Sequence, residues 1–208
     1  GGGVFVHFDN ISGKKAEVYV DTEVHNSGKR TRTVAVETVL VDAGDVPVKR
    51  VSQQVKLQAG ESKTVRQRFA VRNPKLWSPD SPYLYRIQSR VKAGHEVLDG
   101  GVTRVGIRKA EFKGKDGFWL NGKPFGQLVG ANRHQDFAYV GNALPNSQQW
   151  RDAKRLRDAG CTIIRVAHYP QDPAFMDACD EMGLFVIVAT PGWQYWNKNP
   201  EFAKLVHR

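Results

Sequence analysis

The sequence predicts an all-β sandwich followed by a region of parallel strands and helices. Residues 4–107 alternate apolar and polar side chains with a period of two, and turns rich in Gly, Asn and Asp interrupt them, as in a sandwich of about seven strands. From residue 111 onward, short and almost wholly apolar runs alternate with helical stretches, which favours parallel pairing with helical crossovers. We place the boundary between residues 109 and 110, with 1–109 as the sandwich and 110–208 as the α/β part.

Five runs in the first part show the alternation most clearly. They are "AEVYVDTEVHN" (16–26), "TVAVETVLVD" (33–42), "SQQVKLQ" (52–58), "SKTVRQRFAV" (62–71) and "YLYRIQSRV" (83–91). Turn residues separate them, such as those at 26–28 and 42–45. This part has no cysteine, so the sandwich must be held by its apolar core alone. A length of about 100 residues is sufficient for that.

The second part opens with a small hairpin in "FWLNGKPFG", which turns on Asn121 and Gly122. A short apolar strand at 126–131 follows. Asn146 or Ser147 is the expected N-cap of the first helix, in which Trp150, Ala153 and Leu156 form an apolar stripe and which Gly160 ends.

Two further strand–helix units complete the predicted α/β part. A strand in "CTIIRVAH" (161–168) precedes a helix that Asp172 caps, with Pro173 in its first position and Gly183 at its end. The apolar run 184–190 is the third strand, and a helix begins at residue 200. A complete eight-stranded barrel needs roughly 250 residues. The second part is therefore a small open α/β layer or the opening of a barrel.

The composition is that of an ordinary globular protein, with 40% hydrophobic and 25% charged residues. No apolar run reaches the roughly 18 residues of a membrane span, and the first residues do not resemble a signal peptide. Two cysteines, Cys161 and Cys179, are too few for a disulfide framework, and we expect buried free thiols. We therefore expect no membrane partner, and the compartment stays open between bacterial cytoplasm, periplasm and secretion.

The net charge is +10, and most of the excess lies in the first part. A basic surface can bind nucleic acid. Here the cations are spread singly over many strands, as at Arg66, Arg68 and Arg72, and neither a recognition helix nor an aromatic RNA platform is visible. We expect a solvated face or a surface that docks on acidic neighbours, and no nucleic-acid partner.

Polar and aromatic residues follow the three predicted parallel strands, and ligands bind at the carboxyl ends of such strands. Hydrogen-bonding groups together with flat aromatic rings suit a sugar, whose hydroxyls need directional partners. Each residue also has a structural interpretation, since a strand histidine can be part of the core and Arg165 can form an ion pair. The candidate sugar-binding residues are Asn132, His134, Asp136, Arg165, His168, Tyr169 and Trp193.

Five stretches resemble glycoside hydrolase family 2, which includes β-galactosidases, β-glucuronidases and β-mannosidases. They are "NPKLWSPDSPYLYRIQ", "VGIRKAEF", "FWLNGKPF", "GANRHQD" and "IIRVAHYPQDPAFMDACDEMGLFVI". The resemblance implies an immunoglobulin-like sandwich followed by the first three β/α units of a (β/α)8 catalytic barrel. It also implies that His134, Arg165 and His168 line the sugar subsite, with Asn132 and Asp136 beside them. Arg165 would orient an acidic group and His168 would donate to a sugar hydroxyl.

The resemblance implies a retaining β-glycosidase of the β-galactosidase type, with both catalytic glutamates on strands beyond residue 208. We therefore expect a fragment that does not hydrolyse glycosides by itself. Family members commonly have an Asp-Glu pair at the end of the third strand, where this sequence has Val188 and Ala189. The acidic residue can help to hold a metal in some β-galactosidases, so we expect neither a metal nor another cofactor here.

A second hypothesis belongs to a different class: a non-catalytic carbohydrate-binding or adhesion module with a β-sandwich and a small α/β cap. Further strand–helix units encoded after residue 208 would favour the enzyme, and a stop codon would favour the module. In either case a carbohydrate is the expected partner. We also expect that the fragment self-associates or leaves the second part loosely packed, because the third strand would present an unpaired apolar edge and uncovered faces.

Overall fold

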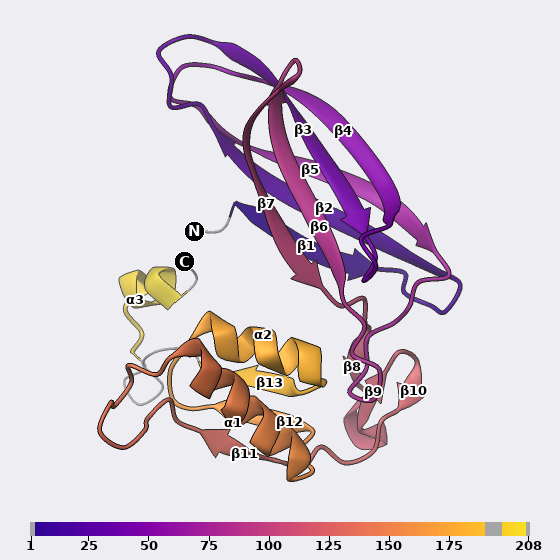
Figure 1. Ribbon diagram of the computed structural model, residues 1–208, viewed down its shortest axis with the longest axis vertical. Helices are drawn as coiled ribbons and strands as arrows, with labels where there is room; N and C mark the ends of the chain where they lie inside the picture. The colour runs from indigo at the N-terminus through magenta and orange to yellow at the C-terminus, as the bar shows by residue number, and fades with distance from the viewer. Residues whose placement is uncertain (1–2, 190–196, 207–208) are drawn as a thin grey trace. The chain divides into compact units, whose positions relative to one another are not determined.

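The computed structural model describes residues 3–189 and 197–206. The chain divides into two compact units, which are described one at a time. Unit 1 is Gly1–Ser78 with Tyr83–Pro124, and unit 2 is Pro79–Pro82 with Phe125–Arg208. The described α-helices and the parallel strands belong to unit 2 (Figure 1). The domain boundary between residues 109 and 110 stays a prediction.

Unit 1 contains two antiparallel sheets, and the predicted β-sandwich is confirmed (Figure 1). The first has the order β1-β2-β5, formed by β1 (Val4–Asp9), β2 (Lys15–His25) and β5 (Ser62–Arg72). The second has the order β4-β3-β6-β7, formed by β3 (Arg32–Val41), β4 (Pro47–Leu57), β6 (Tyr85–Ala93) and β7 (Glu96–Val105).

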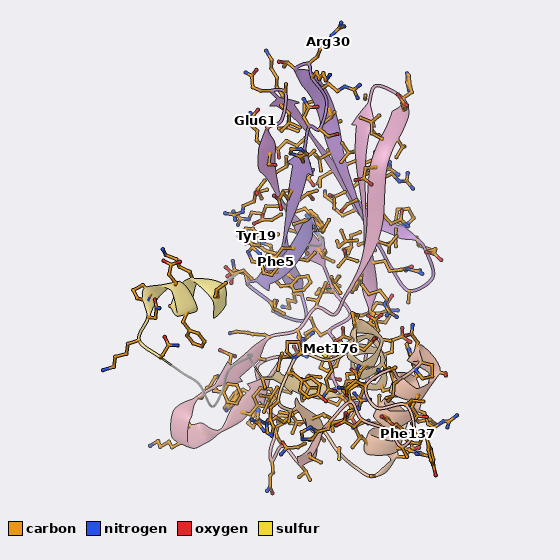
Figure 2. All side chains as sticks on the ribbon, turned by 90° about the vertical axis from the view of Figure 1, so that its left-hand side faces the viewer. Phe5, Tyr19, Arg30, Glu61, Phe137 and Met176 are labelled. Atoms are coloured by element: carbon orange, nitrogen blue, oxygen red, sulfur yellow. The ribbon has the colours of Figure 1, made fainter. Side chains whose placement is uncertain are left out.

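Because side chains alternate with a period of two, β2 places one set of residues in the core and the other set on the outer face of its sheet. Ala16, Val18 and Val20 are buried in the core cluster of the sandwich. Tyr19 and the neighbouring Phe5 of β1 alternate with core residues and project from the strands (Figure 2). On this outer face His7 stacks on Tyr19 with ring centroids 4.7 Å apart. The sequence pattern therefore specifies which face is buried.

The sandwich interior also contains one polar bridge. Thr38 Oγ1 donates to Gln67 Oε1 at 2.6 Å, and Gln67 Nε2 donates to the Val36 carbonyl oxygen at 2.9 Å. Thr38 and Gln67 are both buried. Because each needs the other to satisfy a buried polar atom, the bridge ties β3 of one sheet to β5 of the other.

A third small sheet of unit 1 confirms the predicted hairpin. It has the order β10-β9-β8, formed by β8 (Ala110–Phe112), β9 (Phe118–Leu120) and β10 (Lys123–Pro124), with a short 3-10 helix, η1 (Gly114–Asp116), between the first two. Asn121 and Gly122 have φ angles of 52° and 81°. Two successive positive φ angles are what a tight hairpin turn requires.

Unit 2 contains a parallel sheet of the order β11-β12-β13, as predicted. Its strands are β11 (Gly130–Arg133), β12 (Ile163–Val166) and β13 (Phe185–Val188). We expected the first strand at 126–131, but β11 begins later and includes Asn132 and Arg133. Gly126, with a φ of 90°, is not extended, and pairing with β12 spans only the four residues of β11.

The helices of unit 2 are α1 (Asn146–Asp158), α2 (Pro173–Met182) and α3 (Pro200–Val206). The expected N-cap of α1 was wrong: Pro145 occupies that position, and its carbonyl oxygen accepts from the Gln148 and Gln149 amides. The expected ends of α2 are confirmed. Asp172 Oδ1 accepts from the Ala174 amide at 2.8 Å, and Gly183 closes the helix with a left-handed φ of 74°.

One face of the parallel sheet packs on helices α1 and α2. The buried residues of this core are Ala153, Ile164, Val166, Phe175, Ala178, Cys179 and Leu184. Trp150 and Leu156 of the predicted stripe are partly buried against it. Both cysteines are free thiols, and burial raises the pKa of Cys179 to about 12, so this thiol remains protonated and inert.

Candidate functional site

Arg165 lies on the side of the sheet opposite to the helices. Its neighbours in β12, Ile164 and Val166, belong to the helix-facing core, and successive side chains of a strand point to opposite faces. The strand pairing places Asn132, Arg165 and Ile187 in one row across β11, β12 and β13. Arg165 is half-buried.

The first two strand ends bring two of the predicted histidines into contact. The rings of His134 and His168 meet edge to face, with centroids 5.3 Å apart and planes inclined by 82°. The Tyr169 ring lies 6.2 Å from His134. The Gln135 amide donates to Tyr169 Oη at 2.9 Å, which ties the segment after β11 to the segment after β12. Three candidate residues therefore form one cluster.

The cluster favours a neutral imidazole at His168. Burial lowers the pKa of His168, and electrostatic interactions with Arg165 and then His134 lower it further. A neutral imidazole has one N–H donor and one acceptor nitrogen, whereas the protonated ring only donates. His168 can therefore pair with a hydroxyl group in either direction at neutral pH.

The other candidate residues are less closely grouped. Asn132 is exposed within β11, in the same row as Arg165. Asp136 is exposed in the segment after β11, beside the Asn142 amide. Phe137 is half-exposed in the same segment and projects outward (Figure 2). Trp193 lies outside the described residues.

The sequence interpretation missed Arg133, which is the buried cation of this region. Its side chain is 6% exposed and forms an ion pair with Asp152 of α1 at 2.7 Å. The sequence did offer a sign that Arg133 lies near the site, since it directly precedes the candidate residue His134. Its importance depends on which face of β11 it occupies, and the sequence pattern of so short a strand does not specify that.

The described strand ends offer no pair of free carboxylates. Asp136 follows β11 and Asp172 follows β12, and the Asp172 carboxylate caps α2. Among the described residues, no group of three or more His, Cys, Asp or Glu side chains is arranged to hold a metal ion.

None of the described helices is long and apolar enough to cross a membrane.

Comparison with known proteins identifies the family. The model for "Glycosyl hydrolases family 2" matches residues 3–108, and the model for the "TIM barrel domain" of the same family matches residues 111–203. The chain belongs to glycosyl hydrolases family 2. Membership confirms the resemblance of the five sequence stretches. It also confirms the predicted order of a sandwich followed by the start of a (β/α)8 barrel.

Relatives named for different activities resemble this family 2 chain. A β-galactosidase of Thermoanaerobacter pseudethanolicus is 36% identical over 193 residues, which are 92% of this chain and 25% of that protein. A putative β-glucuronidase of Formosa agariphila is 36% identical over 177 residues, or 85% of this chain and 20% of that protein. The chain thus spans a quarter or less of these relatives.

Solved structures share the fold of the chain. A family 2 member from Bacteroides cellulosilyticus superposes with a TM-score of 0.86 at 33% identity, covering 99% of this chain and 27% of that one. Bacteroides uniformis β-glucuronidase 2 superposes with a TM-score of 0.88 at 28% identity, covering 97% of this chain and 24% of that one.

Proposed function

We propose that the chain supplies part of the sugar subsite of a retaining β-glycosidase that removes terminal β-linked sugars, in the manner of a β-galactosidase. The observation that carries this proposal is the contact between His134 and His168, with Arg165 on the adjoining sheet face. Family 2 membership supports it, as do relatives named β-galactosidase and β-glucuronidase. We also propose the domain division at residues 109 and 110.

Each group of the cluster has a role that its chemistry suits. Neutral His168 donates a hydrogen bond to a sugar hydroxyl or accepts one from it. His134 packs against the His168 ring, and its own nitrogen atoms can form hydrogen bonds with the sugar. Arg165 attracts and orients an acidic group, because its guanidinium carries a permanent charge with several N–H donors. Tyr169 offers an aromatic face to the C–H side of a pyranose, and for Trp193 the same role stays a prediction from the sequence. Asn132 and Asp136 supply further hydrogen bonds.

The catalytic step requires groups that the described strand ends do not contain. A retaining glycosidase uses two carboxyl groups about 5–5.5 Å apart, one as acid and base and one as nucleophile. Asp136 alone cannot fill both roles, and Asp172 is engaged at the helix end. We therefore propose that both catalytic carboxylates lie outside the 208 residues.

A panel of nitrophenyl β-glycosides tests this proposal. The polypeptide encoded by the complete reading frame should hydrolyse at least one β-galactoside or β-glucuronide with retention of the anomeric configuration, and the 208-residue chain should hydrolyse none. The variant His168→Ala should lower kcat/KM of the complete polypeptide at least 100-fold, an order of magnitude set by the loss of a positioned polar contact. Turnover by the pure 208-residue chain that Asp136→Asn abolishes would contradict the proposal.

A second candidate function is a non-catalytic carbohydrate-binding or adhesion module. The specific observation in its favour concerns carboxylates. In the described segments after β11 and β12, Asp136 is the one carboxylate that does not cap a helix, and a single carboxylate is too few for glycoside hydrolysis. Sequencing the gene beyond codon 208 separates the two. A stop codon, together with sugar binding and no hydrolysis, would establish the module.

A further inference from the structure

Arg133 places a guanidinium between the sheet and its helices. Nε and Nη2 donate to Asp152 Oδ2 at 3.3 and 2.7 Å, and Nη2 also donates to Gln149 Oε1 at 2.8 Å. Nη1 donates to Gln171 Oε1 at 2.5 Å. The Cζ atom lies 4.0 Å from the centroid of the Phe175 ring. Burying this cation costs free energy, which these partners offset.

The backbone of the same residue holds the loop that follows β12. The Arg133 carbonyl oxygen accepts from the Ala167 amide at 3.0 Å and from Gln171 Nε2 at 2.6 Å. Gln171 thus binds Arg133 twice, once through the guanidinium and once through the carbonyl oxygen. Ala167 and Gln171 stand at the two ends of the loop that carries His168 and Tyr169. Arg133 therefore fixes both ends of this loop, here named the 167–171 loop.

We propose that Arg133 is the positioning residue of the sugar site, holding the 167–171 loop so that the His168 ring lies against the His134 ring. This role rests on the proposed function of the site. His134 follows Arg133 directly in the chain, so Arg133 determines where the His134 side chain starts. Through Ala167 and Gln171 it also holds the loop that carries His168. Lysine cannot replace it, because a point-like ammonium group cannot reach Asp152, Gln149 and Gln171 together in the fork geometry of guanidinium.

The variant Gln171→Glu separates positioning from stability. Its carboxylate keeps an acceptor for the guanidinium and adds an ion pair, so the folded state retains its partner for the buried cation. It loses the Nε2 donor, and a carboxylate oxygen then faces the Arg133 carbonyl oxygen. We expect the 167–171 loop to shift away from the Arg133 carbonyl oxygen, about the retained contact of residue 171 with the guanidinium, while the rest of unit 2 stays folded. Arg133→Lys is the companion variant, in which the fork geometry itself is lost.

The matched control is Asp158→Asn on the same helix as Asp152. Asp158 pairs with Lys154 on the exposed side of α1, where both side chains are more than half exposed. This variant removes an ion pair of α1 without affecting Arg133 or the 167–171 loop. It should change neither the site nor the unfolding temperature appreciably, since exposed ion pairs contribute little.

Two measurements test the positioning role. In the 208-residue chain, an NMR cross-peak between ring protons of His134 and His168 should be present in the wild type and in Asp158→Asn, and absent in Gln171→Glu and Arg133→Lys. In the complete polypeptide, Gln171→Glu should lower kcat/KM for a cleaved β-glycoside about 10- to 100-fold, as expected when a contact group is displaced by about 1 Å. The unfolding temperature of Gln171→Glu should stay close to that of the wild type.

The outcomes separate this role from the proposed function. If the cross-peak and kcat/KM both survive in Gln171→Glu, or if only one of them is lost, Arg133 is not the positioning residue. Should Arg133→Lys fail to fold, Gln171→Glu alone decides. If the complete polypeptide cleaves no β-glycoside, the proposed function fails, and the cross-peak still decides whether Arg133 positions the two rings.

Discussion

Replacing Gly183 with alanine should destabilise unit 2 through two separate effects. Gly183 ends α2 with a φ of +74°, a conformation that costs an L-residue about 1 kcal/mol or more. An added Cβ would also overlap the Pro79 carbonyl oxygen and lie 2.6 Å from Pro79 Cα. The Pro79 backbone cannot move freely, because Arg157 Nη2 donates to its carbonyl oxygen at 3.0 Å. Overpacking of this kind costs about 1–3 kcal/mol, so the total is about 2–4 kcal/mol.

Gly160→Ala provides the matched control for this prediction. Gly160 follows α1 with a φ of +86°, and an added Cβ would meet nothing within 4 Å. It therefore carries the conformational cost without the overlap. Urea unfolding followed by circular dichroism at 222 nm reports on the helices, which belong to unit 2 in the described part of the chain. If Gly183→Ala costs no more free energy of unfolding than Gly160→Ala, the close approach of Pro79 is not a constraint.

Three further predictions concern the sandwich and the third strand. Lys15, Asn10 and Arg68 lower the pKa of Glu17 from 4.5 to about 2, so the stability that this carboxylate contributes is present above pH 4.5 and is lost as the pH falls toward 2. In acid unfolding, Glu17→Gln should show a smaller loss over that range than the wild type, and an equal loss would contradict this. Thr38→Val should cost about 1–3 kcal/mol in urea unfolding because Gln67 Oε1 loses its donor, whereas an unchanged midpoint would show that water replaces it. Light scattering should show concentration-dependent self-association that Ile187→Lys reduces, because Ile187 and Val188 are 50% and 49% exposed on the edge strand of the described sheet; a compact monomer at all concentrations would refute this.

The sequence specified the elements whose ends carry distinctive residues. Helix α2 was predicted at both ends because Asp172, Pro173 and Gly183 each perform a position-specific role there. The start of α1 was wrong because Asn146 and Ser147 are good capping residues, and the preference of a side chain does not reveal which residue adopts the extended conformation. Pro145, with its fixed φ of −68°, takes that position and leaves Asn146 as the first helical residue.

The same limit applies to the candidate site. His134, His168 and Tyr169 were found because they follow predicted parallel strands, and the ends of such strands lie side by side. Arg133 was missed because its role depends on facing α1, and a strand of four residues has too few alternations to show which face is which. The pairing of β11 with β12 decides which face Arg133 occupies. That pairing depends on the folded sheet and cannot be read from the residues of β11 alone.

Two arginines on neighbouring strands show what the choice of face means for a charged residue. Arg133 points toward the helices, where Asp152, Gln149 and Gln171 accept four hydrogen bonds from it. Arg165 points to the other face, where its row contains Asn132 and Ile187 and no described residue forms an ion pair with it. The charge of Arg133 is therefore balanced by Asp152 of α1, and its other donors are occupied by Gln149 and Gln171. Burial lowers the pKa of His168, and the charge of Arg165 lowers it further. An Arg165 side chain with no ion pair among the described residues suits the role proposed for it, which is to orient an acidic group.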